Sequence, residues 1–316
     1  MSALYDRLCQ ETPAAWRRTA EAAASAGHPI DANATRIWFA FYPLELHRAL
    51  EAAPDPALAA RRLGLMGRWR LADQVDTSHR FFFAHRYWPQ VKSAVQAFAG
   101  SGPPDLSALT TAVADAAART ARVDREFLLG IGAAALMTLR QAGLDAFAGA
   151  GRVHLSDRAR ALSPRQVLKQ RARDDWQGLF GFARGLRKRW TVTFDENEPA
   201  ATFTAIHDQE LASAAQSDKR DYRARDVRCT PSEGPIPVEC RAASCGTCWV
   251  GLLAGAEKLS PVAPNDEGRR MKVFGYLDSA DERPIIRLAC QARTTGAVSI
   301  VIPPWNGIIA SCFDRP

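Results

Sequence analysis

The sequence predicts an α+β protein, in which a helical N-terminal part precedes a smaller part that contains strands. Through the first 190 residues, apolar residues recur at helical spacing between breaks at Pro and Gly. From Trp190 onward, short segments of β-branched and aromatic residues are typical of strands. Six of the seven cysteines follow residue 228. We therefore expect an all-helical domain over residues 1–190, a second domain over 191–303 and a tail over 304–316.

The first helices are delimited by proline and glycine. Residues 3–26 are expected to be helical, with a break at Gly27-His28-Pro29. The apolar residues from Ile37 to Leu44 continue the helical spacing, and Pro43 indicates a kink or a new start. A short helix is expected over 56–64, followed by one or two helices over 68–99 with an interruption near Pro89.

The rest of the helical part contains its most apolar segment. Residues 101–105 predict a linker that ends in a helix cap at Asp105, before an amphipathic helix over 105–122. Residues 124–147 are apolar nearly all round, which predicts a central helix surrounded by the others. Ser163 and Pro164 then open a basic helical stretch to about Arg189.

Five strands are expected in the second part. They cover 190–194, 202–206, 249–253, 285–289 and 297–302. After the second strand, Asp208 is expected to cap a short helix over 209–216. An irregular or partly helical insert is expected over 261–277.

Composition excludes several classes of protein. With 47% apolar and 24% charged residues, the chain is an ordinary globular one rather than a disordered one. We find no secretory signal and no apolar run of membrane-spanning length, so we expect a cytoplasmic protein. The net charge of +7 is uneven, because the first 190 residues carry 27 Lys and Arg against 17 Asp and Glu. No dinucleotide-binding or phosphate-binding glycine motif is found.

The cysteines carry the clearest chemical signal. Cys240, Cys245 and Cys248 are spaced C-x4-C-x2-C, and Cys290 follows further along the chain. This spacing with a distant fourth cysteine is typical of plant-type [2Fe–2S] sites, where thiolates complete the tetrahedra of two irons. Four cysteines can also hold zinc, although zinc sites usually show two C-x2-C pairs. An odd number of cysteines without a secretory signal argues against a disulfide framework.

The sequence around these cysteines resembles the plant-type ferredoxins. The resemblance covers 191–303 and includes the cluster loop, Cys240-Arg241-Ala242-Ala243-Ser244-Cys245, and the later segment Leu288-Ala289-Cys290-Gln291-Ala292. It implies a β-grasp fold, a [2Fe–2S] cluster and a redox partner protein. It also implies that Cys240 and Cys245 bind one iron while Cys248 and Cys290 bind the other.

This chain departs from the family in four places. The span between the third and fourth cysteines is long, so residues 254–284 are expected to form an enlarged surface element. The stretch from Ser217 to Pro237 is also long. Ala243 stands where the family usually has Gly, which predicts that this position does not need a left-handed backbone. Trp249 either shields the cluster or fills the core, and with Thr247 it sets the surroundings of the site.

Other residues allow a functional and an ordinary interpretation. Asp73, Asp76 and His79, with His85 nearby, could hold a second metal or line a tetrapyrrole pocket, but the ordinary interpretation is hydrogen-bonded helix residues. Three more cysteines are expected to be small apolar residues: Cys9, Cys229 and Cys312. The basic residues of 151–190 form either a docking face or a solvated helix face, and no nucleic-acid motif accompanies them.

Three functions remain open on these observations. The first is a one-electron carrier that holds a [2Fe–2S] cluster and docks a redox partner through its basic helical domain. The second is a redox enzyme whose helical domain binds a substrate or cofactor and receives electrons from the cluster. The third is a sensor in which the redox state of the cluster controls an interaction.

Overall fold

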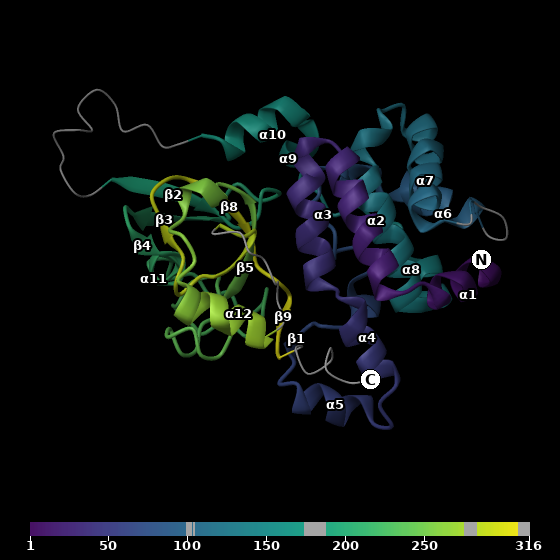
Figure 1. Ribbon diagram of the computed structural model, residues 1–316. Coiled ribbons are helices and arrows are strands. Elements are labelled where there is room, and N and C mark those ends of the chain that lie inside the picture. Colours follow the sequence, from purple (N-terminus) through teal and green to yellow (C-terminus); the bar gives the residue numbers. More distant parts are fainter. Residues whose placement is uncertain (99–102, 104, 174–187, 275–282, 309–316) are drawn as a thin grey trace. The chain divides into compact units, whose positions relative to one another are not determined.

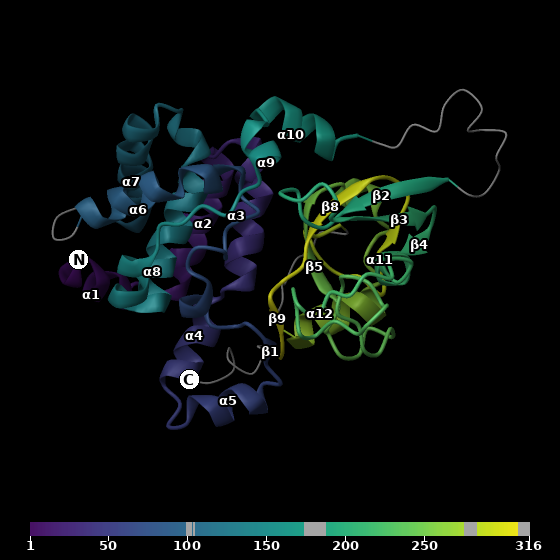
Figure 2. The same ribbon diagram turned by 180° about the vertical axis from the view of Figure 1, so that it is seen from behind.

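A computed structural model gives the architecture of the chain (Figures 1 and 2), and it describes residues 1–98, 103, 105–173, 188–274 and 283–308. The chain forms two compact units. The first comprises Met1–Arg48 and Arg70–Pro164, and the second comprises Ala49–Trp69 and Arg165–Pro316. The fold is therefore α+β, with one helical unit and one unit built on a sheet, as the sequence predicts.

The regular secondary structure described in the first unit is helical. Its elements are α1 Ser2–Gln10, α2 Pro13–Ala26, α3 Pro29–Phe41, α4 Leu44–Glu51, η1 Leu71–Gln74, η2 Phe83–Tyr87, α6 Trp88–Ala97, α7 Leu106–Ala121, η3 Arg125–Phe127, α8 Leu129–Gly149 and α9 Asp157–Ala161. Helix α8 packs against α1, α2, α3, α6 and α7, and every residue from Leu129 to Arg140 is buried. The expected central helix is confirmed.

Several helix ends follow local capping chemistry. Pro29 and Pro56 each occupy the first turn of a helix, and Asp105 accepts the backbone N–H of Ala108 at the start of α7. The helical segment expected over 3–26 consists of two helices, because Thr12 accepts the N–H of Ala15 and starts a second helix there. Pro43 separates α3 from α4, so the new start is the correct alternative.

The segment before Pro89 differs from the sequence prediction. Residues 71–87 form two 3-10 turns, η1 and η2, instead of α-helix. The carboxylate of Asp31, which is buried in α3, accepts the backbone N–H groups of Phe83 and Ala84 at 2.7 and 3.0 Å. Since those amides are used by a distant side chain, they do not continue a helix. Helix α6 begins at Trp88, with Pro89 in its first turn.

The second unit is built on a five-stranded mixed sheet of order β3-β2-β8-β5-β6, in which only β2 and β8 are parallel. Its helical elements are α5 Pro56–Arg62, α10 Pro164–Arg171, α11 Leu211–Ala215, η5 Ala256–Lys258, the π-helical turn η6 Pro264–Gly268 and α12 Arg269–Phe274. Its strands are β1 Met66–Gly67, β2 Arg189–Thr193, β3 Thr202–Ile206, β4 Gln209–Glu210, β5 Trp249–Ala254, β6 Ile286–Leu288, β7 Arg293–Thr294, β8 Val298–Val301 and β9 Trp305–Asn306. Helix α11 packs on β3, so a small mixed sheet carries a helix, as in the β-grasp fold.

The short strand β1 connects residues 49–69 to the second unit. Met66 pairs with Asn306 and Gly67 pairs with Trp305 in an antiparallel bridge. Gly67 has a φ of 84°, and a Cβ there would lie 2.4 Å from the carbonyl oxygen of Pro304, so only glycine fits. The pairing explains why a segment from the N-terminal part of the sequence belongs to the unit with the sheet.

Two expectations for the second unit need correction or fall outside the description. Asp208 does not cap the helix; its φ is 63°, and Glu210 is the N-cap of α11, which is shorter than expected. Helix α10 begins near the expected place, but residues 174–187 of the basic stretch lie outside the described residues. In the part of the chain that is described, none of the helices combines the length and apolarity needed to cross a membrane.

Candidate metal centre

The loop from Cys240 to Cys245 folds its backbone N–H groups onto a thiol. The N–H groups of Ala242, Ser244 and Cys245 lie 3.5, 3.3 and 3.3 Å from the sulfur of Cys240. Burial raises the pKa of the Cys240 thiol, but these hydrogen bonds outweigh it and lower the pKa to about 7. The loop therefore favours a thiolate at Cys240, which is the form that binds metal.

The loop depends on left-handed residues. Arg241 and Ala243 both have a φ of 55°, and Gly246 has a φ of 72°. The expectation that Ala243 avoids the left-handed region is therefore wrong. A positive φ turns successive N–H groups toward the same side of the loop, which is how a short segment surrounds an anion. At Ala243 the requirement to direct the N–H groups toward the thiol outweighs the preference of an L-residue for negative φ.

The thiols of Cys248 and Cys290 lie against each other at the end of the sheet. Cys248 immediately precedes β5, while Cys290 follows β6, the neighbour of β5 in the sheet. The Cys248 thiol donates to Cys290 and lowers the pKa of Cys290 to about 6, while burial opposes this and Gln291 assists. The same hydrogen bond raises the pKa of Cys248 well above its usual value. Cys248 therefore keeps its proton and donates it in a hydrogen bond to the sulfur of Cys290.

The four sequence-predicted ligands are all in this one region. Cys240 and Cys245 are partly exposed, while Cys248 and Cys290 are buried. Cys245 lies near enough to Cys248 to raise the pKa of that thiol electrostatically. Within the described ranges, no three His, Cys, Asp or Glu side chains gather closely enough to hold a single ion. The structure thus groups the thiols in pairs, and two thiolates on each of two metals is the donor set of a diiron cluster.

The residues after the third cysteine belong to the core. Thr247 and Trp249 are buried, and the indole N–H of Trp249 donates to the carbonyl oxygen of Trp305 at 2.8 Å. The two indole rings meet edge to face, with centroids 5.1 Å apart. The core-filling interpretation of Trp249 therefore accounts for its contacts.

Cys229 and Cys9 take no part in this region. Cys229 is buried, its thiol lies 3.5 Å from the carbonyl oxygen of Pro235, and burial raises its pKa to about 12. Cys9 lies in α1 and is partly exposed. Cys312 lies outside the described residues.

The second metal site that Asp73, Asp76 and His79 could have formed is not found among the described residues. Asp76 lies in a turn, where it accepts the indole N–H of Trp88 and the backbone N–H of Gly151, both at 2.7 Å. Asp73 pairs instead with Arg70 at the surface. His79 and His85 are buried and hydrogen-bonded to each other. The hydrogen-bonded interpretation of these residues is the correct one.

Two groups near the thiols were not predicted from the sequence. The side-chain amide of Gln291 lies 3.5 Å from the sulfur of Cys290 and donates to it. Glu267, in the insert, is buried and acts electrostatically on Cys290. Gln291 adjoins a cysteine and could have been noticed, whereas the approach of Glu267 depends on how the insert folds.

A comparison with protein families assigns this region. Residues 231–295 match the family model described as the 2Fe-2S iron-sulfur cluster binding domain. No curated protein and no solved structure matches the chain. Residues 231–295 therefore form a ferredoxin-like domain that binds a [2Fe–2S] cluster, which favours this cluster over zinc. The domain supports a role in electron transfer.

Proposed function

We propose that Cys240, Cys245, Cys248 and Cys290 hold the [2Fe–2S] cluster and that the protein carries single electrons between partner proteins. The observation on which this rests is the set of three backbone N–H groups directed at the Cys240 sulfur. When bound, the cluster accepts one electron and returns it. Fixed N–H dipoles stabilise the added negative charge without rearrangement of the chain.

The two pairs of thiols also support the ligand assignment that the resemblance implies. Cys245 donates its N–H to the sulfur of Cys240, and Cys248 contacts Cys290. One pair therefore serves each iron. The first pair is partly exposed, next to the exposed residues Arg241 and Ser244, so electrons would enter and leave on this side.

Single Cys-to-Ser variants test the ligand assignment. Replacement of Cys245 should abolish the visible absorbance and the low-temperature electron paramagnetic resonance signal of the reduced cluster. The control is Cys229→Ser, because that thiol is buried elsewhere and its pKa is raised to about 12. The circular dichroism of the helical unit should persist in both variants. A full cluster signal in Cys245→Ser would refute the assignment.

We further propose that basic residues dock an acidic redox partner. Exposed basic side chains recur on α10 and just beyond it, all within the second unit; they are Arg165, Lys169 and Arg173. Such a surface attracts an acidic protein and speeds its association at low ionic strength. The experiment is reduction by an acidic electron-donor protein in stopped flow. Arg165→Glu with Lys169→Glu should lower the second-order rate constant and its salt dependence, whereas Arg61→Glu should not.

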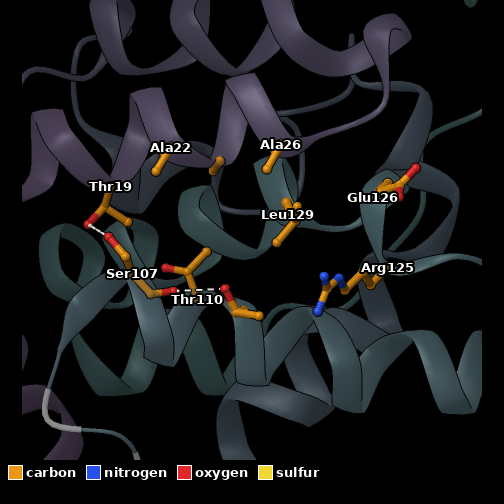
Figure 3. Close-up of a pocket in the computed structure, with 10 residues that line it drawn as sticks. Thr19, Ala22, Ala26, Ser107, Thr110, Arg125, Glu126 and Leu129 are labelled. Carbon is orange, nitrogen blue, oxygen red and sulfur yellow. Dashed lines mark hydrogen bonds between the residues drawn. The ribbon is translucent and has the colours of Figure 1, made fainter.

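A cavity in the helical unit favours the enzyme as a second candidate. It has a volume of about 180 Å³ and lies between α2, α7 and the turn that precedes α8. Figure 3 shows the Arg125 side chain entering from one side and the hydroxyls of Thr19 and Ser107 on the other. Arg125 also has an ion pair with Asp115 at 3.8 Å. Glu126 lines the same cavity, and a small carboxylate with a short apolar part against Ala22 would have to replace Asp115 as the partner of Arg125.

The lining of the cavity includes neither His79 nor His85, near which a tetrapyrrole pocket was possible, so its test is independent of those residues. We expect propionate to stabilise the helical unit in a thermal unfolding experiment and Arg125→Met to remove the effect. Arg119→Met, in the last turn of α7, is the control. The enzyme candidate requires in addition that a reducible carboxylate of this size, supplied as the electron acceptor, takes electrons from the reduced cluster in the absence of air. Absence of both effects would refute the enzyme candidate.

A further inference from the structure

The insert between the third and fourth cysteines places a carboxylate inside the protein. Glu267, in η6, is 1% exposed, and its partner Arg287, in β6, is fully buried. The guanidinium donates from Nε and Nη2 to the two carboxylate oxygens, each at 2.8 Å. This two-point contact is the strongest geometry for an arginine and a carboxylate. Both charges are therefore removed from water and balance each other.

The same carboxylate covers an open edge of the sheet. Strand β6 is the last strand of the sheet, so its outward N–H groups have no strand to pair with. Glu267 accepts the backbone N–H of Leu288 at 2.8 Å. Arg287 uses its remaining nitrogen to donate to the carbonyl oxygen of Ser260, also at 2.8 Å. The insert is thus attached to β6 by four hydrogen bonds.

This attachment lies two residues before the fourth thiol. Leu288 starts the turn that carries Cys290, since its carbonyl oxygen accepts the N–H groups of Gln291 and Ala292. On the other side, the N–H of Ala289 donates to the carbonyl oxygen of Cys248. The position of the Cys290 sulfur therefore depends on a strand end that Glu267 holds from outside the sheet.

We propose that Glu267 is a positioning residue of the metal centre, which fixes the segment that presents Cys290 and whose negative charge, balanced by Arg287, sets the energy of the added electron. The inference rests on the proposed function, because it takes Cys290 as a ligand of the cluster. Charges buried in a protein act over longer distances than charges in water. An unbalanced Arg287 would favour the reduced cluster, which carries one more negative charge, because arginine stays protonated in proteins.

The test is the midpoint potential of three variants in an anaerobic redox titration followed by electron paramagnetic resonance. Glu267→Gln keeps the size of the side chain and leaves Arg287 unbalanced. It should raise the ratio of reduced to oxidised cluster at a fixed potential on the order of tenfold, which is a 59 mV positive shift for one electron. The double variant Glu267→Gln, Arg287→Gln restores the balance and should return to the wild-type potential. Glu210→Gln is the control, because Glu210 pairs with Arg293 at the surface and water screens that pair.

Each outcome either supports or overturns the proposed role of Glu267. A positive shift in the single variant that the double variant reverses supports the proposal. An unchanged or more negative potential in Glu267→Gln overturns it, as does an equal shift in both variants. If Glu267→Gln does not retain a cluster, the double variant alone tests the proposal. A cluster at the wild-type potential in the double variant supports charge balance, and loss of its cluster refutes the proposal. A wild-type protein without [2Fe–2S] signals would instead refute the proposed function.

Discussion

His79 and His85 share a hydrogen bond between their Nδ1 atoms, which lie 2.9 Å apart in the interior of the helical unit. His85 also accepts the backbone N–H of His154 at its Nε2 atom, at 3.0 Å. A neutral imidazole carries one proton, so the proton of His85 is on Nδ1 and His79 accepts it. The Nε2 atom of His79 is buried and, among the described residues, has no hydrogen-bond partner.

This buried pair predicts that acid weakens the helical unit. Burial lowers the pKa of His79 to about 3 and that of His85 to about 2, against an ordinary value near 6.5. Below pH 6.5 the unfolded chain therefore binds protons that the folded chain does not, and the free energy of unfolding falls as the pH falls. Each ring contributes a slope of up to about 1.4 kcal/mol per pH unit between pH 6 and pH 4.

Urea unfolding followed by tryptophan fluorescence at pH 7, 6 and 5 measures this slope. His85→Gln should be less stable at pH 7 and should lose stability less steeply with acid, because one buried base is gone. His207→Gln, at an exposed position, should follow the wild type. Equal slopes in wild type and His85→Gln would contradict the prediction.

The backbone at Ala243 gives a second prediction. Since its φ is 55° and its side chain is buried, glycine should relieve about 1 kcal/mol of backbone strain and lose a similar amount of packing. Ala243→Gly should therefore retain the cluster. Ala243→Val should lose it, because a β-branched residue tolerates a left-handed backbone poorly. Iron and sulfide content per chain, with the visible absorbance, measures both; a valine variant with full content would show that the loop adopts another conformation.

A third prediction concerns the ion pair of Arg171 and Glu196 in the second unit. The guanidinium donates to both carboxylate oxygens at 2.8 Å, and the hydroxyl of Ser299 in β8 donates to the same carboxylate at 2.6 Å. Arg171→Ala should cost about 2 kcal/mol, because it leaves a mostly buried carboxylate unpaired. The measurement is urea unfolding followed by bleaching of the cluster. Arg223→Ala, which breaks an exposed pair with Asp221, should leave the midpoint unchanged.

A fourth prediction concerns the indole of Trp249. Trp249→Phe removes the donor to the Trp305 carbonyl oxygen and leaves that oxygen buried, which should lower the free energy of unfolding by about 1–3 kcal/mol. Because the ring fills the core, the potential of the cluster should change little. A large change of potential with unchanged stability would show that Trp249 acts on the cluster instead. The same redox titration and urea unfolding distinguish the two results.

The features that the sequence predicts well are local. Asp105 caps α7 by a contact three residues away, and the helix over 124–147 is visible from its apolar residues alone. The four proposed ligands could be named as candidates because three of these cysteines lie in one loop. By contrast, the turns of 71–87 depend on Asp31, which is far away in the sequence, so local propensity predicts helix there. In the sequence, Glu267 and Arg287 are ordinary charged residues, because their contact forms only in the fold.

The left-handed backbone at Ala243 shows another limit. The residue type argues for an ordinary conformation, but the hydrogen-bonding requirement of the thiol loop decides the backbone. Residue preference is a small free energy, and several N–H groups directed at one sulfur can exceed it. Such exceptions are expected where a chain binds a cofactor.

The pairing of β1 with β9 can form only late in the synthesis of the chain, because β9 is made long after β1. Met66 and Gly67 leave the ribosome long before Asn306 and Trp305, their partners. The early segment must therefore wait, unpaired, while the helices that follow it are made. A truncated protein that begins at the first strand of the sheet would likewise lack β1, which belongs to the second unit. Studies of the isolated ferredoxin-like part should therefore supply residues 49–69 as a separate peptide.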